Sequence, residues 1–484
     1  MKNTVIRYKL TVLACLAVLG ITTSCSNWLD VKPKTEMEAE DLFSTEDGFK
    51  ETLAGCYTMM TKTSLYGREM TFGLVDAIAQ QWDIAATDNT HAYYDASRYD
   101  YEATTTQTMI DSIWSAGYNL IANVNSILDY IDEKQDLFTS DNYAIIKGEA
   151  LAIRAYMHFD LLRLFGTDGV STSTEDGIPY VTELTKNVTR TVSPQQVITN
   201  VVADLEDAIA LLEVDPILTG REVTGDDDNG YLMNRQYHLN YYAATALLAR
   251  VQLYGGLLTE ARRNAMTIIT AHENEGMFPW VEEDAVTGGS SISKDRVFSS
   301  ELLFALNVRK LEDYINGYFT STQRPMRTRL STSELFPVPE LRAELFETID
   351  GNANIPSKLR QMEAGTDTGT GQYEEPVRDR MPMIRMAEMY YIVAECDMAD
   401  AGAALESLNK VLTGRGYDEQ SLLSSSTVNT PAAVLSEIQN EYQREFICEG
   451  QLFYFYKRQG VAEINSQQVQ YQLPKPDLEI EFGQ

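Results

Sequence analysis

Cysteine is scarce in this chain, and its spacing excludes two kinds of scaffold. Of the five cysteines among 484 residues, Cys15 and Cys25 lie near the N-terminus, and Cys56, Cys396 and Cys448 are far apart in the remainder. Three widely spaced cysteines supply neither a disulfide framework nor the paired spacing of a zinc site. Each lies in an apolar, helix-like stretch, which favours a buried free thiol.

Histidine is also scarce, and the motifs of the common enzyme classes are missing. The four histidines, His91, His158, His238 and His272, are scattered, so they nominate neither a catalytic triad nor a metal cluster. The sequence contains no HExxH, G-x-S-x-G or phosphate-loop motif. Pairs of acids are too common among 71 Asp and Glu residues to indicate a glycosidase dyad. The sequence therefore predicts a protein that is not an enzyme and that carries no cofactor.

One acidic turn resembles a calcium loop only in part. Residues 225–230 read GDDDNG. The glycine is fifth from Asp226, whereas a calcium loop has it sixth, and no glutamate stands at the twelfth position. A solvated turn is the preferred interpretation, and calcium binding is the alternative.

Basic residues are too few to balance the acids. The chain has 39 Lys and Arg against 71 Asp and Glu, a net charge of -32, and such a chain repels nucleic acid and anionic lipid. It is 44% hydrophobic and 10% aromatic, a composition far from that of disordered proteins. We therefore expect a folded protein with an acidic, solvated surface and no nucleic-acid partner.

The N-terminal segment has no apolar run long enough to span a membrane. Three basic residues precede an apolar run over residues 10–21, which is shorter than the roughly 20 residues that a transmembrane helix needs. This pattern is typical of a cleaved export signal over residues 1–24. Small residues then lead to Cys25, as in a bacterial lipobox, although Thr22 stands where leucine is commonest. We predict lipid attachment at Cys25; an ordinary secretory signal with an incidental cysteine is the alternative.

Helical periodicity dominates the rest of the chain, and long alternating strands are scarce. The sequence predicts helices over residues 45–60, 114–131 and 149–165. A fourth helix is predicted from Ser193 to Leu212, because a serine cap precedes a proline at the first helical position.

Two later segments, residues 241–269 and 389–412, each read as a helix, a glycine-bearing turn and a second helix. Each has about the length of a tetratricopeptide unit, whose helices bury their apolar stripes only against neighbouring units. Residues 300–306 are predicted to form a short strand. We therefore expect a mainly α fold with a stacked helical scaffold.

The long irregular segments contain too many aromatic residues for plain disorder. In residues 80–105, QQWDIAATDNTHAYYDASRYDYEATT, rings alternate with acids, amides and an arginine. A pyranose has one face of C–H groups and a rim of hydroxyls, so a sugar site needs flat rings beside hydrogen-bonding side chains. The candidate ligand-binding residues are Trp82, Asp83, Asn89, Tyr93, Tyr94, Arg98, Tyr99, Tyr101 and, from a separate segment, Trp280.

These tyrosines also fit a second interpretation, in which their rings form a small core that holds the loop down. A further segment, residues 314–329, joins three aromatic residues to Arg324, Arg327 and Arg329. It is either part of the ligand face, a contact with a partner, or a solvated surface.

Seven fragments in series resemble the SusD/RagB nutrient-binding lipoproteins of Bacteroidetes outer membranes. They are NWLDVKP after Cys25, EALAIRAYMHFDLLRLFG leading to GIPYV, VVADLEDAIALL, ALLARVQLYGG, PMIRMAEMYYIVAECD, EYQREFICEGQLFYFYKRQG and YQLPKPDLEIEFG. Their order and spacing fit from Cys25 to the end, so the resemblance covers nearly all of the mature chain.

The resemblance implies a single SusD-like domain over residues 25–484, with an N-terminal part to residue 212 and a C-terminal part from residue 213. About four tetratricopeptide-like helix pairs would form the scaffold, and a loop-rich half would carry the binding face. It further implies a protein anchored through Cys25 to the outer membrane at the cell surface. Its partner would be a SusC-like, TonB-dependent transporter, over which it closes as a lid.

The ligand implied by the resemblance is a glycan, either an oligosaccharide or a polysaccharide. An oligopeptide is the alternative within the same family, and a secreted α-helical glycoside hydrolase is the alternative from another class. Two or three stacked rings contribute about 0.5–1.5 kcal/mol each and a few hydrogen bonds about 1 kcal/mol each, which places the dissociation constant between millimolar and micromolar.

Overall fold

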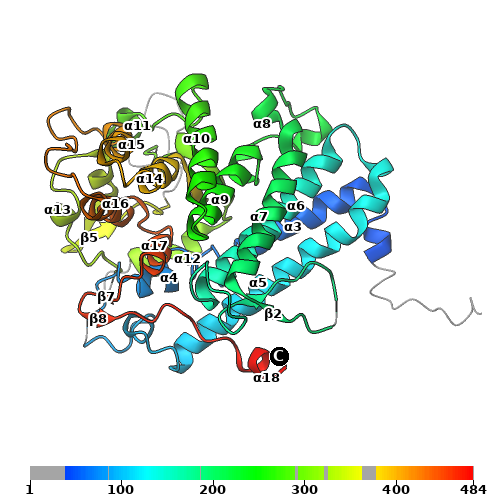
Figure 1. Cartoon of the computed structure of the whole chain (residues 1–484), viewed down its shortest axis with the longest axis horizontal. Helices are drawn as coiled ribbons and strands as arrows, with labels where there is room; N and C mark the ends of the chain where they lie inside the picture. Colours follow the sequence, from blue (N-terminus) through cyan, green and yellow to red (C-terminus); the bar gives the residue numbers. More distant parts are fainter. Residues whose placement is uncertain are drawn as a thin grey trace, which may run out of the picture.

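The computed structural model describes residues 39–482, except for residues 86, 186, 289–292, 321–324 and 362–377. The predicted signal peptide, Cys25 and Arg324 therefore lie outside the described residues. In the described part, helices dominate and the strands are short (Figure 1). The expected mainly α fold class is confirmed.

The long helices form a row in which each packs against the next one along the chain. The row consists of α3 (Glu46–Met60), α5 (Thr104–Ile131), α6 (Asn142–Phe165), α7 (Pro194–Leu211), α9 (Tyr241–Tyr254), α10 (Leu258–Glu275), α14 (Met386–Cys396), α15 (Ala401–Gly414) and α16 (Pro431–Glu445). It runs from right to left in Figure 1, and α17 (Leu452–Gln459) packs against α16. Such serial packing is expected of a helical stack, whereas the tetratricopeptide-like geometry of the pairs stays a prediction.

Helix ends follow from local side-chain chemistry. The hydroxyl of Thr45 accepts a hydrogen bond from the backbone N–H of Gly48 at 3.2 Å, which caps α3. Ser193 caps α7 in the same way through Gln196, and Pro194 occupies the first turn. The predicted helices over residues 45–60 and from Ser193 are thus confirmed to within a residue. The other two begin earlier than predicted, at Thr104 and Asn142, and their added turns bury Ile110 and Ile113 of α5 and Ile145 and Ile146 of α6.

The described strands form four two-stranded antiparallel sheets. The longest pairs β3 (Leu302–Asn307) with β6 (Arg380–Arg385), and Asn307 lies opposite Arg380. The others pair β1 (Ile178–Pro179) with β2 (Thr191–Val192), β4 (Phe346–Ile349) with β5 (Asn352–Pro356), and β7 (Glu463–Ile464) with β8 (Gln467–Gln468). The predicted strand over residues 300–306 is confirmed as β3.

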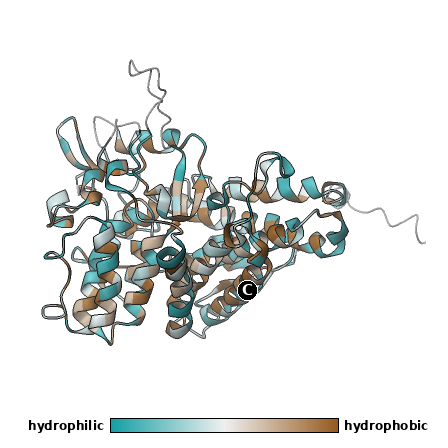
Figure 2. Ribbon diagram, turned by 90° about the horizontal axis from the view of Figure 1, so that it is seen from above, coloured by the Kyte–Doolittle hydropathy of each residue, from teal (hydrophilic) through white to brown (hydrophobic). Residues whose placement is uncertain are grey.

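Helix α6 lies at the centre of the N-terminal half and is buried from Gly148 to Phe165. Most other helices carry both hydrophobic and hydrophilic residues along their length (Figure 2), as helices with one solvated face do. Within α6, His158 contacts the carbonyl of Arg154 through Nδ1 and accepts from the backbone N–H of Val181 through Nε2. Burial lowers the pKa of His158 to about 3, so the ring is neutral and structural.

A buried acid joins α6 to the irregular segment before α9. Glu149 is fully buried and contacts Arg235 at 2.6 Å, His238 Nδ1 at 2.9 Å and the hydroxyl of Tyr57 at 2.7 Å. Burial alone would raise the pKa of Glu149, but the charges of His238 and Arg235 outweigh it and lower the pKa to about 2. Arg235 also pairs with Asp215 at 2.6 Å, so this cluster fixes the path of the chain between α7 and α9.

We expect Glu149 to make the fold sensitive to acid. Because its folded pKa of about 2 lies below the ordinary value of 4.5, its contribution is present above pH 4.5 and is lost as the pH falls towards 2. The loss amounts to about 3 kcal/mol. Urea unfolding at several pH values should show that the stability difference between wild type and Glu149→Gln shrinks over this interval. Glu51→Gln, at an exposed position of α3, is the control; a pH-independent difference for Glu149→Gln would contradict the assignment.

The C-terminal half is held by a larger buried ionic cluster. It contains Arg342, Lys358, Arg385 and Arg415 together with Glu301, Glu340, Glu441, Glu445 and Glu449, all buried. Arg415 binds Glu301 through two hydrogen bonds of 2.6 and 2.7 Å and reaches Glu445 at 2.7 Å. The cluster has one more acidic than basic side chain. Burial raises the pKa of Glu340 to about 7 despite the nearby Arg342, so partial protonation of Glu340 offsets the extra negative charge. The cluster connects the residue before β3 with β6, with the residue that follows α15, and with α16.

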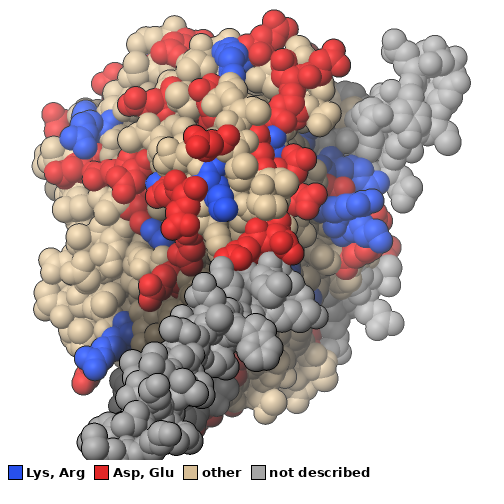
Figure 3. Space-filling view, turned by 90° about the vertical axis from the view of Figure 1, so that its right-hand side faces the viewer, with Lys and Arg blue, Asp and Glu red and all other residues tan. Residues whose placement is uncertain are grey.

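The surface is acidic, as the composition predicts. Figure 3 shows a face on which Asp and Glu greatly outnumber Lys and Arg. Cys56 and Cys448 are buried free thiols, as predicted, and Cys396 is a half-buried free thiol. Among the helices of the described ranges, none combines the length and the apolar character needed to cross a bilayer.

Candidate ligand-binding site

The two aromatic loop segments chosen from the sequence lie side by side in the structure. Trp82 and Thr328 form an antiparallel bridge. The backbone N–H of Asp83 donates to the carbonyl of Arg327 at 2.9 Å, and the N–H of Arg329 donates to Gln81 at 2.8 Å. The segments therefore form one surface, which we call the loop face, defined by residues 82–85, 87–99 and 325–330. It lies beside α4 (Leu74–Ile78) and α12 (Leu311–Phe319), which are neighbours in Figure 1.

Four of the candidate rings lie below this face, in the core. Trp82, Tyr93, Tyr99 and Tyr101 are between 0% and 6% exposed. The indole N–H of Trp82 donates to the carbonyl of Phe72 at 2.8 Å, and the hydroxyls of Tyr99 and Tyr101 donate to the carbonyls of Ile78 and Gln470. A buried ring offers no flat face to a sugar. The expectation that these four rings stack directly on a ligand is therefore corrected: they support the loop face from below. They form the core that the second interpretation described.

The remaining candidates of this segment stay at the surface. The centre of the half-buried Tyr94 ring lies 3.7 Å from the guanidinium carbon of Arg98. A guanidinium N–H of Arg98 also donates to the backbone carbonyl of Tyr94 at 2.7 Å. The cation covers one face of the ring and fixes its position. Asp83 is exposed and pairs with Arg327 at 2.7 Å, and Asn89 is exposed. The loop face thus carries a ring oriented by one guanidinium group and, separately, an exposed ion pair of a carboxylate with a second guanidinium group.

Trp280 belongs to a different part of the molecule. Its half-buried ring lies 5.1 Å from His272 of α10, 5.6 Å from Tyr390 of α14 and 5.2 Å from the guanidinium of Arg415. A β-carbon at Gly414 would come within 2.6 Å of the indole, so the glycine permits this close approach. The structure does not bring Trp280 together with the other candidates.

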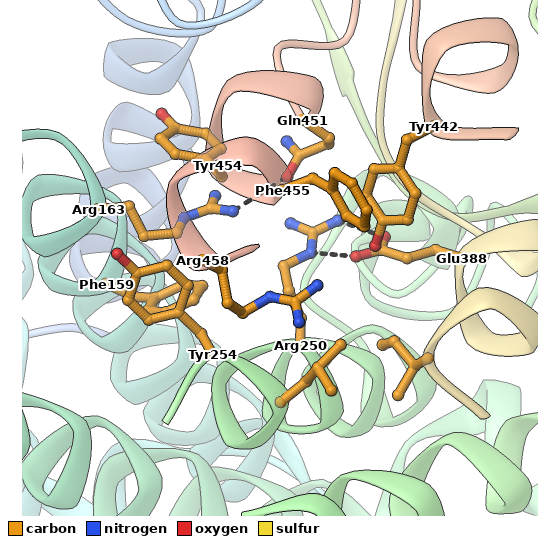
Figure 4. A pocket seen from close by; sticks show the side chains of 12 residues that line it. Phe159, Arg163, Arg250, Tyr254, Glu388, Tyr442, Gln451, Tyr454, Phe455 and Arg458 are labelled. Atoms are coloured by element: carbon orange, nitrogen blue, oxygen red, sulfur yellow. Dashed lines mark hydrogen bonds and ion pairs between the residues drawn. The ribbon is translucent and has the colours of Figure 1, made fainter. Parts of the chain in front are cut away.

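Figure 4 shows a small polar cavity between the two halves of the chain, lined by Arg163, Arg250 and Arg458. Arg250 pairs with Glu388 at 2.6 Å, and Arg163 donates to Gln451 at 3.1 Å. Arg458 pairs with Glu395, and Arg163 with Asp160. The cavity volume of about 20 Å³ suits one water molecule. These arginines therefore hold helices together and leave no room for a sugar.

A second cavity, of about 510 Å³, is lined by residues of α5, of β1 and the segment that follows it, and of α18 (Asp477–Phe482) with the preceding Pro476. Helices α5 and α18 lie in the lower part of Figure 1. The cavity lining includes Trp114, Tyr118, Glu183 and Glu479. No sequence pattern indicates this cavity, because residues of three distant segments line it and none of the segments carries a motif of its own.

The acidic turn at residues 225–230 is held by the protein itself. Asp228 pairs with Lys50 at 2.6 Å and accepts from Asn142 at 2.8 Å, and Asp227 accepts from Thr224. In the part of the chain that the structure describes, no group of three His, Cys, Asp or Glu side chains is placed to hold a metal ion.

Comparison with known families accounts for both halves of the chain. Residues 27–253 match a family model described as starch-binding and associating with the outer membrane, and residues 355–475 match the model of the SusD family. Together these matches cover most of the sequence, and the chain belongs to the SusD/RagB family.

Individual relatives are distant. SusD-like protein P38 of Formosa agariphila is 26% identical over 198 residues, which are 40% of this chain and only 35% of that protein. A SusD superfamily protein from Bacteroides vulgatus has a similar fold, with a TM-score of 0.68, 20% identity and coverage of 90% of this chain and 97% of that one. A SusD-like carbohydrate binding protein from the same organism gives a TM-score of 0.63 at 19% identity, covering 86% and 83%. At such identities the likeness concerns the fold.

Proposed function

We propose that this chain is a cell-surface lipoprotein that binds a glycan and delivers it to a TonB-dependent transporter of the outer membrane. Membership of the SusD/RagB family over most of the sequence is the observation that carries this proposal. Acyl chains on Cys25 would tether the protein, since two or three chains hold a protein on a membrane where one chain holds it marginally. The protein would then act as the lid of a SusC-like transporter.

The loop face is the proposed place of glycan contact. Tyr94 supplies the ring, and Asp83, Asn89, Arg98 and Arg327 supply acceptors and donors around it. The bridge between Trp82 and Thr328 supports this proposal, because it holds the neighbouring Asp83 and Arg327 next to each other. Such a site binds sugar hydroxyls without a nucleophile or a paired general acid and base, so we expect capture without cleavage.

Calorimetry of the soluble chain, begun after Cys25, tests this function. We expect saturable binding of at least one member of a panel containing starch, laminarin, xylan and mannan, with a dissociation constant between millimolar and micromolar. No shortened product should accumulate. Binding of oligopeptides alone would assign the chain to the peptide-binding alternative, and release of sugars would show a hydrolase.

Replacement of Tyr94 by alanine should weaken this binding. A stacked ring contributes about 0.5–1.5 kcal/mol beyond its burial, so we expect the dissociation constant to rise about threefold to tenfold. Tyr94→Phe should keep most of the affinity, because the ring remains. The matched control is Tyr143→Ala, since Tyr143 is also half-buried beneath a cation, Lys147, but lies on α6. Equal affinities of wild type and Tyr94→Ala would exclude Tyr94 from the site.

A further inference from the structure

The cavity of about 510 Å³ beside α5 has the dimensions and walls of a ligand site. Its volume falls within the roughly 300–1,000 Å³ of small-molecule pockets. One wall is α5, the second consists of residues 179–185 and 187–189 between the start of β1 and β2, and the third is Pro476 with Glu479 of α18. None of its residues belongs to the loop face.

The floor of the cavity is a fixed aromatic pair. The rings of Trp114 and Tyr118 lie 4.8 Å apart, and Phe165 supports the indole from behind at 4.8 Å. The hydroxyl of Tyr118 donates to the carbonyl of Pro179 at 2.9 Å. This bond joins the floor to the neighbouring wall, so the rings cannot turn freely.

The wall formed by the loop is held from its inner side. The amide of Asn125 donates to the carbonyl of Val181 at 3.0 Å, and Asp129 accepts from the backbone N–H of Leu184 at 3.0 Å. Arg154, which pairs with Asp204 at 2.7 Å, donates to the carbonyl of Thr182. The cavity is therefore largely formed before any ligand arrives, which reduces the entropic cost of binding.

The rim is polar and acidic. Six of the fourteen lining residues carry hydroxyl, amide or carboxylate groups on polar side chains: Ser115, Glu183, Thr185, Asn187, Thr189 and Glu479. Burial raises the pKa of Glu479, and burial together with Asp477 raises that of the nearby Asp111. The described lining includes two carboxylates and neither Lys nor Arg. Such a rim accepts hydrogen bonds from hydroxyls and repels uronic acids or sulfated sugars.

We propose that this cavity is a second glycan site, which takes a short neutral oligosaccharide over the half-buried Tyr118 ring, against which the buried Trp114 packs. An aromatic ring beside hydroxyls, an amide and carboxylates matches the C–H face and hydroxyl rim of a sugar. A groove for an apolar peptide segment would have fewer polar side chains in its lining. The inference rests on the proposed function, and it adds that one polymer can engage two sites of a single chain, which raises the apparent affinity through effective concentration.

Equilibrium dialysis of the soluble mature chain tests the second site by stoichiometry. The probes are maltohexaose, laminarihexaose, xylohexaose and mannohexaose. We expect the wild type to bind two molecules of at least one of these probes per chain at saturation. The Ser115→Arg variant should bind only one, because the arginine side chain fills the cavity. Ser115 is exposed, so the variant should fold; Val188→Arg, on the opposite rim and 60% exposed, should give the same result. Thr105→Arg is the control, exposed on the same helix about 15 Å away.

Native gel electrophoresis through the matching polysaccharide provides the second readout. The apparent affinity of Ser115→Arg for the polysaccharide, measured from its retardation, should be at least tenfold lower, because two sites that bind one polymer have a much higher apparent affinity than either site alone. One molecule per chain, unaffected by Ser115→Arg, would overturn this inference and leave the proposed function standing. Loss of all binding in Ser115→Arg would support the cavity and exclude the loop face. If the wild type binds no probe and no polymer, both proposals are overturned. A Lys-Val hexapeptide is dialysed in the same way; if the wild type binds this peptide but no sugar, and Ser115→Arg abolishes the binding, the cavity is a peptide site instead.

Discussion

Replacement of Arg415 by alanine should lower the free energy of unfolding by about 3–5 kcal/mol, the cost of leaving buried charges without a partner. Arg415 is completely buried and is the common partner of Glu301 and Glu445. Without it, Glu301 loses both of its 2.6 and 2.7 Å hydrogen bonds. Urea unfolding at pH 7 measures the loss.

Two further variants show whether the loss comes from unpaired charge. Arg262→Ala removes an exposed ion pair with Asp397, and its effect should stay within about 1 kcal/mol. The double variant Arg415→Met with Glu301→Leu should be more stable than Arg415→Met alone, because it removes both members of the pair. Equal effects of Arg415→Ala and Arg262→Ala would contradict the buried cluster.

Replacement of Trp82 by alanine should also lower the free energy of unfolding by about 3–5 kcal/mol, as for other large buried rings. The ring is 1% exposed, packs edge-on to Phe319 at 5.6 Å and donates to Phe72. Its backbone forms the bridge to Thr328, so the same change should loosen the loop face and weaken glycan binding. Thermal unfolding and calorimetry of one preparation measure both effects.

The comparison with Tyr94 separates support from contact. Trp82→Phe keeps most of the buried ring and should retain binding with a smaller loss of stability. Tyr94→Ala should reduce binding and leave stability close to that of wild type. If Trp82→Ala weakened binding without any loss of stability, Trp82 would contact the ligand directly, and its supporting role in the core would be wrong.

The helical scaffold could be predicted from the sequence because it depends on local signals. Apolar periodicity and the caps at Thr45 and Ser193 place helices, and β-branched or apolar runs such as residues 300–306 place strands. The seven fragments also gave the family correctly. These features require only residues close together in the chain.

The site was less readable, because burial depends on residues far away. Tyr94 and Tyr93 are adjacent and chemically identical, yet Tyr93 stacks at 5.9 Å on Tyr318 of α12 and is fully buried. No local pattern distinguishes them. The cavity at Trp114 could not be predicted for the same reason. Its walls come from α5, from the chain after β1, and from Pro476 and Glu479, which are far apart in the sequence.

Hydrogen exchange with and without a bound glycan tests the central claim most directly. The soluble mature chain would be saturated with the tightest-binding polysaccharide of the panel and analysed by mass spectrometry. The account predicts slower exchange in both segments of the loop face, with the glycan recovered at its original length. Unchanged exchange in both segments while the glycan is bound, or recovery of a shortened glycan, would contradict it.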